Sequence, residues 1–135
     1  MRDGALVDTD VLIDLELASK VHDVDALLGD EPSAVSVITV SELLHGTLRA
    51  KGAVRVRRRA FVEHLLDGLQ TIPITAPIAR THAEIWAALT ARGVPIGTHD
   101  LWIAATALAH GLGLATRNVS HYDRVAGLRV VTVAL

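Results

Sequence analysis

The chain has 135 residues, half of them hydrophobic and only 3% aromatic, and its formal net charge is −2. The length is that of one domain, and the charge argues against simple coating of nucleic acid by a basic surface. There is no cysteine, which excludes a disulfide framework, a thiolate nucleophile and a zinc site that uses sulfur. We expect a single domain over residues 1–135, with no membrane segment and a cytoplasmic location.

Apolar stretches of the chain alternate between the spacing of a strand and that of a helix, and turn residues such as Gly52, Gly93 and Pro95 separate them. In chain order we expect a strand over residues 5–7, a helix through residues 11, 12, 15 and 17, a helix over 21–28, a strand over 34–38, helices over 39–50 and 54–69, a strand over 71–74, a helix over 78–91, a helix capped by Thr98 and running through 110, and strands over 114–116 and 128–133. This alternation predicts an α/β fold with a mainly parallel central sheet.

Acidic side chains stand where distant stretches of the chain should converge. Asp8 and Asp10 follow the first strand, and we expect Glu42 and Asp100 to lie in the first turns of their helices. Asn118 follows another strand end. Because ligands of open parallel sheets bind beyond the carboxyl ends of the strands, we expect these side chains to face one cleft.

Helix capping is an alternative interpretation of each acid alone. Asp10 and Asp100 suit helix starts, and Thr39 with Glu42 fits a capping box. Capping does not explain Asp8, which directly follows the apolar strand. The joint pattern therefore favours a site.

A metal ion is the simplest explanation for crowded carboxylates, because they would otherwise raise one another's pKa. Oxygen ligands without cysteine select Mg²⁺ or Mn²⁺ over zinc, and Mg²⁺ commonly takes phosphate oxygens at its open positions. Such an ion can orient a water, lower its pKa and stabilise charge on a phosphate under attack. The pattern therefore indicates phosphoryl chemistry.

Four motifs follow one another with characteristic spacing: Leu-Val-Asp-Thr-Asp-Val-Leu-Ile-Asp-Leu near the start, Val-Ser-Glu-Leu-Leu-His-Gly from residue 40, Asp-Leu-Trp-Ile-Ala-Ala-Thr-Ala-Leu from residue 100, and Ala-Thr-Arg-Asn-Val-Ser-His-Tyr from residue 115. Together they make the chain resemble PIN-domain proteins of the VapC toxin type. The resemblance implies a three-layer α/β/α fold and an Mg²⁺-dependent endoribonuclease that cuts cellular RNA. It also implies a VapB-like antitoxin as partner, and makes a homodimer plausible.

The resemblance assigns Asp8, Glu42 and Asp100 as catalytic residues and metal ligands. Members of the family often carry a fourth acid before an aromatic residue, where this chain has a histidine. The candidates that the chain offers for this fourth position, or as an added ligand, are Asn118, His121, Asp123 and Asp10. The departure leaves open whether one or two ions bind.

The one basic cluster lies between residues 49 and 59. Arg55, Arg58 and Arg59 are its candidate RNA contacts, because guanidinium groups pair well with phosphate. Alternatively, the cluster is the solvent-exposed start of a helix, because consecutive arginines cannot all lie on one helix face and contact the same RNA. Arg117, next to the expected cleft, is a further candidate for holding a phosphate or an antitoxin carboxylate.

Two other functions compete with the nuclease. Asp8 and Asp10 after a strand would suit an aspartyl-nucleophile phosphatase, although the usual Gly-Thr and later lysine are missing. The missing fourth acid would suit a non-catalytic domain that binds RNA or a partner. We expect Trp86 and Trp102 to serve the core or a dimer interface rather than base stacking.

Overall fold

The structure is a computed structural model, and it describes residues 4–17 and 33–133. In chain order the elements are β1 (Ala5–Val7), α1 (Thr9–Leu17), β2 (Ser33–Ser36), α3 (Val37–Arg49), α4 (Gly52–Asp67), β3 (Gln70–Ile72), α5 (Ala76–Arg92), α6 (Thr98–Ala109), β4 (Gly113–Thr116), α7 (Val119–Tyr122) and β5 (Val130–Thr132). The helix expected over residues 21–28 lies outside the described residues.

The five strands form one sheet in the order β3-β2-β1-β4-β5, and all four pairings are parallel. The chain builds the sheet from β1 outward through β2 and β3, and then crosses to the other side of β1 with β4. The strand order therefore reverses between β1 and β4. In parallel sheets this is the place where ligands bind.

The central strands β1, β2 and β4 are buried on both faces, and their successive side chains enter different layers. Leu6 of β1 and Leu114 of β4 pack into one apolar cluster, whereas Val7 and Ala115, the next residues, pack into a second. This alternation is the two-residue period of a strand. The sheet therefore separates two apolar layers.

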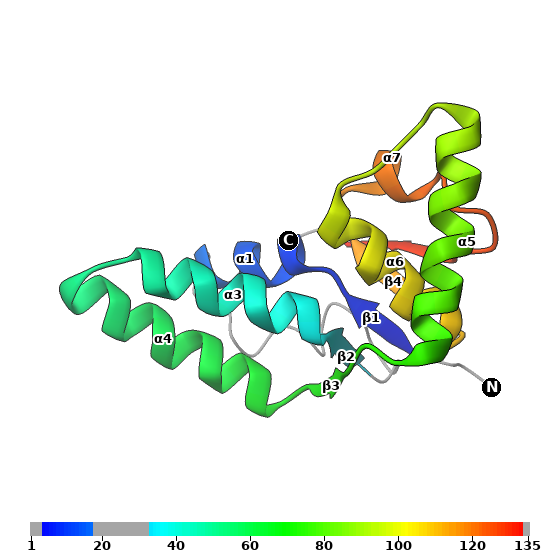
Figure 1. The fold of residues 1–135 in the computed structure, drawn as a ribbon. Coiled ribbons are helices and arrows are strands. Elements are labelled where there is room, and N and C mark those ends of the chain that lie inside the picture. The colour runs from blue at the N-terminus through cyan, green and yellow to red at the C-terminus, as the bar shows by residue number, and fades with distance from the viewer. Residues whose placement is uncertain (1–3, 18–32, 134–135) are drawn as a thin grey trace.

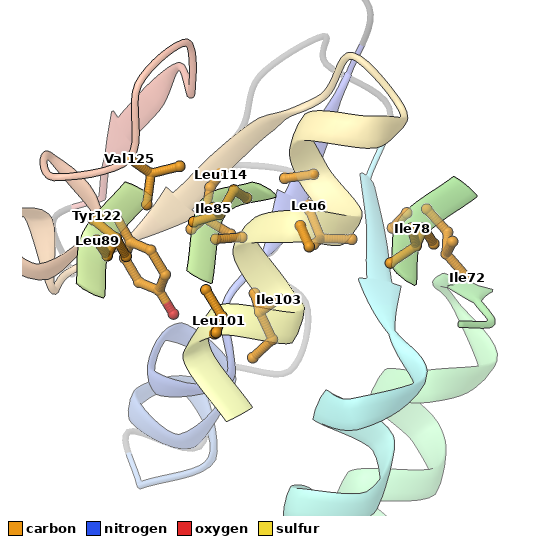
Figure 2. Packing of buried hydrophobic residues seen from close by; sticks show 14 residues of the cluster. Leu6, Ile72, Ile78, Ile85, Leu89, Leu101, Ile103, Leu114, Tyr122 and Val125 are labelled. Atoms are coloured by element: carbon orange, nitrogen blue, oxygen red, sulfur yellow. The ribbon is translucent and has the colours of Figure 1, made fainter. Parts of the chain in front are cut away.

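Helices cover both faces of this sheet. Apolar residues of α5 and α6, such as Ile78 and Ile103, pack with Leu6 and Leu114 on one side (Figure 2). On the other side α1, α3 and α4 contribute the second cluster, and α3 and α4 extend away from the sheet as an antiparallel pair (Figure 1). The expected three-layer α/β/α arrangement with a parallel sheet is confirmed.

Several expected element starts and ends were wrong by one or two residues, and side-chain capping explains the clearest case. The second strand ends at Ser36, whose hydroxyl accepts a hydrogen bond from the Ile38 amide at 3.0 Å and so starts α3 two residues earlier than expected. Thr39 therefore lies inside α3 and forms no capping box with Glu42. Thr98 is the first residue of α6 rather than its cap, which is Gly97.

No helix in the described ranges is both long and apolar enough to cross a membrane.

Candidate active site

Asp8 stands at the centre of the site, directly after β1 and at the point where the strand order reverses. Its backbone amide donates to the Ala115 carbonyl of β4 at 2.9 Å. One carboxylate oxygen accepts from the Thr9 amide and the other from the Thr116 hydroxyl, both at 2.8 Å. Only 4% of Asp8 is exposed. Its carboxylate is thus fixed between the ends of the two central strands.

Asp10 lies beside it in the first turn of α1. Asp10 Oδ2 accepts from the Arg117 amide at 3.2 Å, and the Thr116 hydroxyl lies 3.4 Å from the same oxygen. Asp10 Oδ1 is buried and has no hydrogen-bond partner among the described residues. An unpartnered buried carboxylate oxygen beside a second carboxylate is costly unless a cation joins them.

The carboxylates perturb one another. Burial, followed by repulsion from Asp10 and Asp100, raises the pKa of Asp8 from 3.8 to about 7, although hydrogen bonds from Thr116 and Thr9 oppose this. Burial also raises the pKa of Asp10. Holding both residues ionised at neutral pH therefore requires compensating positive charge.

Asp100 reaches the same place from the first turn of α6, as expected. His121 Nδ1 lies 3.8 Å from Asp100 Oδ2, and the Asn118 amide nitrogen lies 2.8 Å from that same ring nitrogen. Asn118 in turn donates from its backbone to the Thr116 hydroxyl at 2.9 Å. The segment after β4 therefore supports Asp100 through His121 and Asn118.

Tyr122 closes the floor of the site. It is fully buried, and its phenol oxygen points toward the start of α6 (Figure 2). Burial and the nearby charges of Asp8 and Asp100 raise its pKa far above the ordinary value. The neutral phenol therefore adds no negative charge beside the acids.

Glu42 lies in the second turn of α3, because α3 begins at Val37, so its expected place in a first turn was wrong. The Thr9 hydroxyl donates to Glu42 Oε1 at 2.7 Å, and His99 Nδ1 lies 3.3 Å from Glu42 Oε2. The Thr39 hydroxyl lies 2.9 Å from Thr9 Oγ1. Thr9 therefore joins Glu42 to the Asp8 end of the site.

A family model described as the PIN domain matches residues 5–128. The chain belongs to the PIN-domain family. Ribonuclease VapC1 from Rickettsia felis is 34% identical over 132 residues, which cover 97% of each chain. The tRNA(fMet)-specific endonuclease VapC from Salmonella typhimurium is 31% identical over 96 residues, or 71% of each chain.

Solved structures agree with this assignment. The VapBC structure from Salmonella typhimurium, determined with bound DNA, superposes with a TM-score of 0.85 at 26% identity and covers 98% of both chains. These comparisons place our PIN domain among the VapC ribonucleases. Nucleases of this type depend on a divalent metal ion.

The residues of this PIN domain fit a divalent ion in their chemistry. In the part of the chain that the structure describes, no three acidic or histidine side chains are arranged to hold an ion as they stand. Nevertheless the donors are carboxylate oxygens, Asp10 Oδ1 has no partner among the described residues, and the pKa of Asp8 is raised by burial and then by neighbouring acids. A hard cation that accepts oxygen ligands would satisfy all three conditions.

Asp123 lies apart from the acids that surround Asp8. It is the exposed C-terminal cap of α7, and its backbone amide bonds to the Val119 carbonyl. Of the candidates for the fourth position, the structure brings Asn118 and His121 to Asp100, and Asp10 to Asp8.

The candidate RNA-binding arginines differ in what they contact. Arg55 donates to the Leu48 and Ala50 carbonyls, both at 2.7 Å. Arg59 pairs with Glu63 on its own helix, whereas Arg117 pairs with Asp14 of α1. Arg58 pairs with Glu16 at 2.8 Å and also lines a cavity of about 610 Å³ beside Glu42. Only Arg58 of this set lines that cavity.

Sequence reasoning missed four residues that shape the site: Thr9, Thr116, Tyr122 and His99. Thr9 and Thr116 stand inside the first and last motifs, next to the acids and strand ends. That position was the available signal. Their threonine type did not distinguish them from ordinary strand or capping residues.

Proposed function

We propose that this chain acts as a metal-dependent endoribonuclease on cellular RNA and is the toxin of a toxin–antitoxin pair. The observation that carries the proposal is the crowding of the Asp8, Asp10 and Asp100 carboxylates where the strand order reverses, in a chain that belongs to the VapC ribonucleases. We place its action in the cytoplasm, where its substrates would be.

Asp8, Glu42 and Asp100 would hold the ion, Mg²⁺ or Mn²⁺, and Asp10 would add a ligand oxygen. When bound, the ion supplies activation of the attacking water and neutralisation of charge on the phosphate. The chain's own residues position the ligands: Thr116 and the Thr9 amide hold Asp8, and the Thr9 hydroxyl holds Glu42. These hydrogen bonds remove rotational freedom that the ligands would otherwise lose on binding.

The partner would be a VapB-like antitoxin. The Salmonella structure with the TM-score of 0.85 is a VapBC structure determined with DNA. The His99 side chain beside Glu42 is 60% exposed, so a partner segment could reach this end of the acidic site. An antitoxin that covers the site would keep RNA away from Asp8 and Asp100.

The phosphatase interpretation is disfavoured by the sequence around Asp8. The Gly-Thr that usually continues such a motif is missing, and so is a lysine in the second half of the chain. The non-catalytic interpretation predicts metal and RNA binding without turnover, and the same assay decides it.

The test uses the purified protein freed of any partner, incubated with total cellular RNA and with tRNA in Mg²⁺, Mn²⁺ or EDTA. We expect discrete fragments that require metal. Asp100→Asn should lower the cleavage rate by about a hundredfold or more, because loss of outer-shell partners alone costs 10–100-fold. The ends of the fragments would identify the cleaved RNA.

Asp67→Asn is the matched control, because it removes one acid at the exposed end of α4 and should keep full activity. Circular dichroism would establish that both variants are folded. A wild-type protein that binds metal but cuts no RNA would overturn the nuclease and favour the binding domain.

A further inference from the structure

A groove adjoins the acidic site and continues along α3. Its volume is about 610 Å³, and it is lined by Thr9 and Ile13 of α1, by Glu42, His45 and Arg49 of α3, and by Arg58 of α4, among others. We propose that Arg49, supported by Arg58, binds the RNA phosphate next to the one that is cut. This inference rests on the proposed nuclease function, and names the residues that orient its substrate.

The groove wall is one face of a helix. Glu42, His45, Gly46 and Arg49 are spaced three, four and seven residues apart, which places them on the same side of α3. Arg49 therefore lies about 10 Å along the helix axis from Glu42, at 1.5 Å per residue. An RNA strand whose reacting phosphate lies at the acidic site would pass Arg49 as it continues along α3.

Arg49 is the available cation of this groove. Among the described residues its side chain makes no hydrogen bond or ion pair, whereas Arg58 is bound to Glu16 through Nε at 2.8 Å and Nη2 at 3.4 Å. The Glu16 side chain is only 8% exposed, so it neutralises Arg58 under conditions of weak screening. Arg49 thus supplies net positive charge, and Arg58 mainly shape and hydrogen-bond donors.

A glycine allows the two arginines to share the groove. A Cβ placed on Gly46 would meet Arg58 Nη2 at 3.5 Å, so the guanidinium rests against the bare backbone of α3. A larger side chain at this position would push the guanidinium away from the wall. The planar donors of Arg58 therefore lie on the same surface as His45 and Arg49.

Phosphate is the ligand that best fits this surface. The groove begins at Glu42, a candidate metal ligand, and ends at Arg49. An acidic protein segment in the groove would therefore be repelled by Glu42 and attracted by Arg49. An RNA backbone would be bridged to the acids by the metal and held directly by the guanidinium. A protein segment in the groove is an outcome that the test distinguishes.

The test measures binding of a fluorescein-labelled single-stranded RNA by anisotropy in EDTA, so that no cleavage occurs. Arg49→Gln should raise Kd about tenfold, since a hydrogen bond to a charged group is lost. The slope of log Kd against log salt should fall by about 0.7, as expected for one phosphate contact on a single strand. Arg49→Lys should restore much of the slope.

Arg57→Gln is the control, because it removes the same charge from an exposed position of α4 that does not line the groove. Its Kd and salt slope should match those of the wild type. Glu16→Gln should tighten RNA binding, since it releases the charge of Arg58. The Arg57→Gln result would show that position in the groove matters, and not net charge.

Three results would overturn the inference: wild-type protein that does not bind RNA, Arg49→Gln binding that equals the wild type, or equal losses in Arg49→Gln and Arg57→Gln. Weaker binding of a purified antitoxin to Arg49→Gln, with RNA binding unchanged, would reassign the groove to the protein partner. Because binding is measured without metal, absence of cleavage would contradict the nuclease and leave this comparison intact.

Discussion

Asp8 couples the protonation of the site to the stability of the fold. Its pKa is about 7 in the folded chain and 3.8 in an ordinary setting, so the folded state binds this proton more tightly between those values. A raised carboxyl pKa means that folding stability falls as pH rises through this window. A cation bound to the ionised site would reverse the loss.

We therefore expect the metal-free protein to lose about 4 kcal/mol between pH 4 and pH 8 relative to Asp8→Asn, because the pKa rises from 3.8 to about 7 and each pKa unit is worth about 1.4 kcal/mol. Urea unfolding in EDTA at several pH values would measure this difference. Mg²⁺ should stabilise the wild type more at pH 8 than at pH 5. A wild type and Asp8→Asn with parallel pH profiles would contradict the expectation.

The fourth position of the site can be resolved by comparing His121 of α7 with Asp123, the cap of that helix. His121 lies 3.8 Å from Asp100, whereas Asp123 is exposed. His121→Ala should lower cleavage about tenfold, in the range seen when a supporting residue of a metal ligand is removed. Asp123→Ala should cleave like the wild type. The opposite ranking, measured as kcat/KM on one RNA, would assign the missing acid to Asp123.

At this scale the sequence predicted the acids better than their supports. Asp8 follows a strand and Asp100 lies in the first turn of a helix, and both stand in motifs that can be recognised locally. Thr116 joins Asp8 only because β1 and β4 pair, and that contact spans 108 residues. A long-range hydrogen bond to a common residue type has no local signature.

Among the elements, the junction of α3 and α4 depends on Arg55. The Arg55 guanidinium donates to two carbonyls at the end of α3, which would otherwise have no partner in a helix. The sequence favoured RNA contact for this residue, because a basic cluster does not reveal which members satisfy backbone groups.

Arg55→Ala should therefore lower the free energy of unfolding by about 1 kcal/mol, the net value of such hydrogen bonds. RNA cleavage should change little. Arg59→Ala, whose partner Glu63 is an exposed neighbour on the same helix, should change stability by less than about 0.5 kcal/mol. Thermal unfolding and cleavage of the two variants give the comparison. Loss of cleavage in a stable Arg55→Ala would support RNA contact instead.

The start of α3 shows why element ends were harder to predict than elements. Ser36 and Thr39 both suit an N-cap by residue type, and the β-branched residues between them suit a strand or a helix. The Ser36 hydroxyl accepts from the Ile38 amide and caps the helix. This earlier start places Glu42 two residues further into the helix, in its second turn and beside Thr9.

Over the whole molecule, the sheet and its two covered faces follow from the alternation of short apolar strands and helices. The strand order β3-β2-β1-β4-β5 does not, because each strand is three or four residues long and has no pattern that selects its neighbour. The predicted convergence of acids nevertheless holds for Asp8 and Asp100, because parallel strands share one carboxyl edge.

We expect the homodimer that the sequence predicts to use the surface around Trp86. Trp86 is 60% exposed beside an apolar cavity of about 360 Å³ that includes Trp102 and Ile96. His82 stacks on Trp102 with ring centroids 3.6 Å apart, and its Nε2 is buried without a hydrogen-bond partner among the described residues. An exposed aromatic beside a preformed apolar cavity is typical of an interface anchor.

Trp86→Lys should weaken self-association by at least about tenfold, as expected for loss of an anchor worth more than 1.4 kcal/mol. Sedimentation equilibrium over a range of concentrations would measure it. Val56→Lys, at an exposed apolar position of α4, is the control and should associate like the wild type. A wild-type protein that stays monomeric throughout the range would contradict the homodimer.

The bond between Thr116 and Asp8 also sets the order of events during synthesis. During synthesis the acidic pocket cannot assemble until β4 has been made and has paired with β1. Strand β1 is made first, because it ends at Val7. A chain that ends after α6 but before β4 carries Asp8, Glu42 and Asp100 but lacks the strand that gathers them. We therefore expect such a product to lack the assembled acidic site, and so to leave RNA uncut.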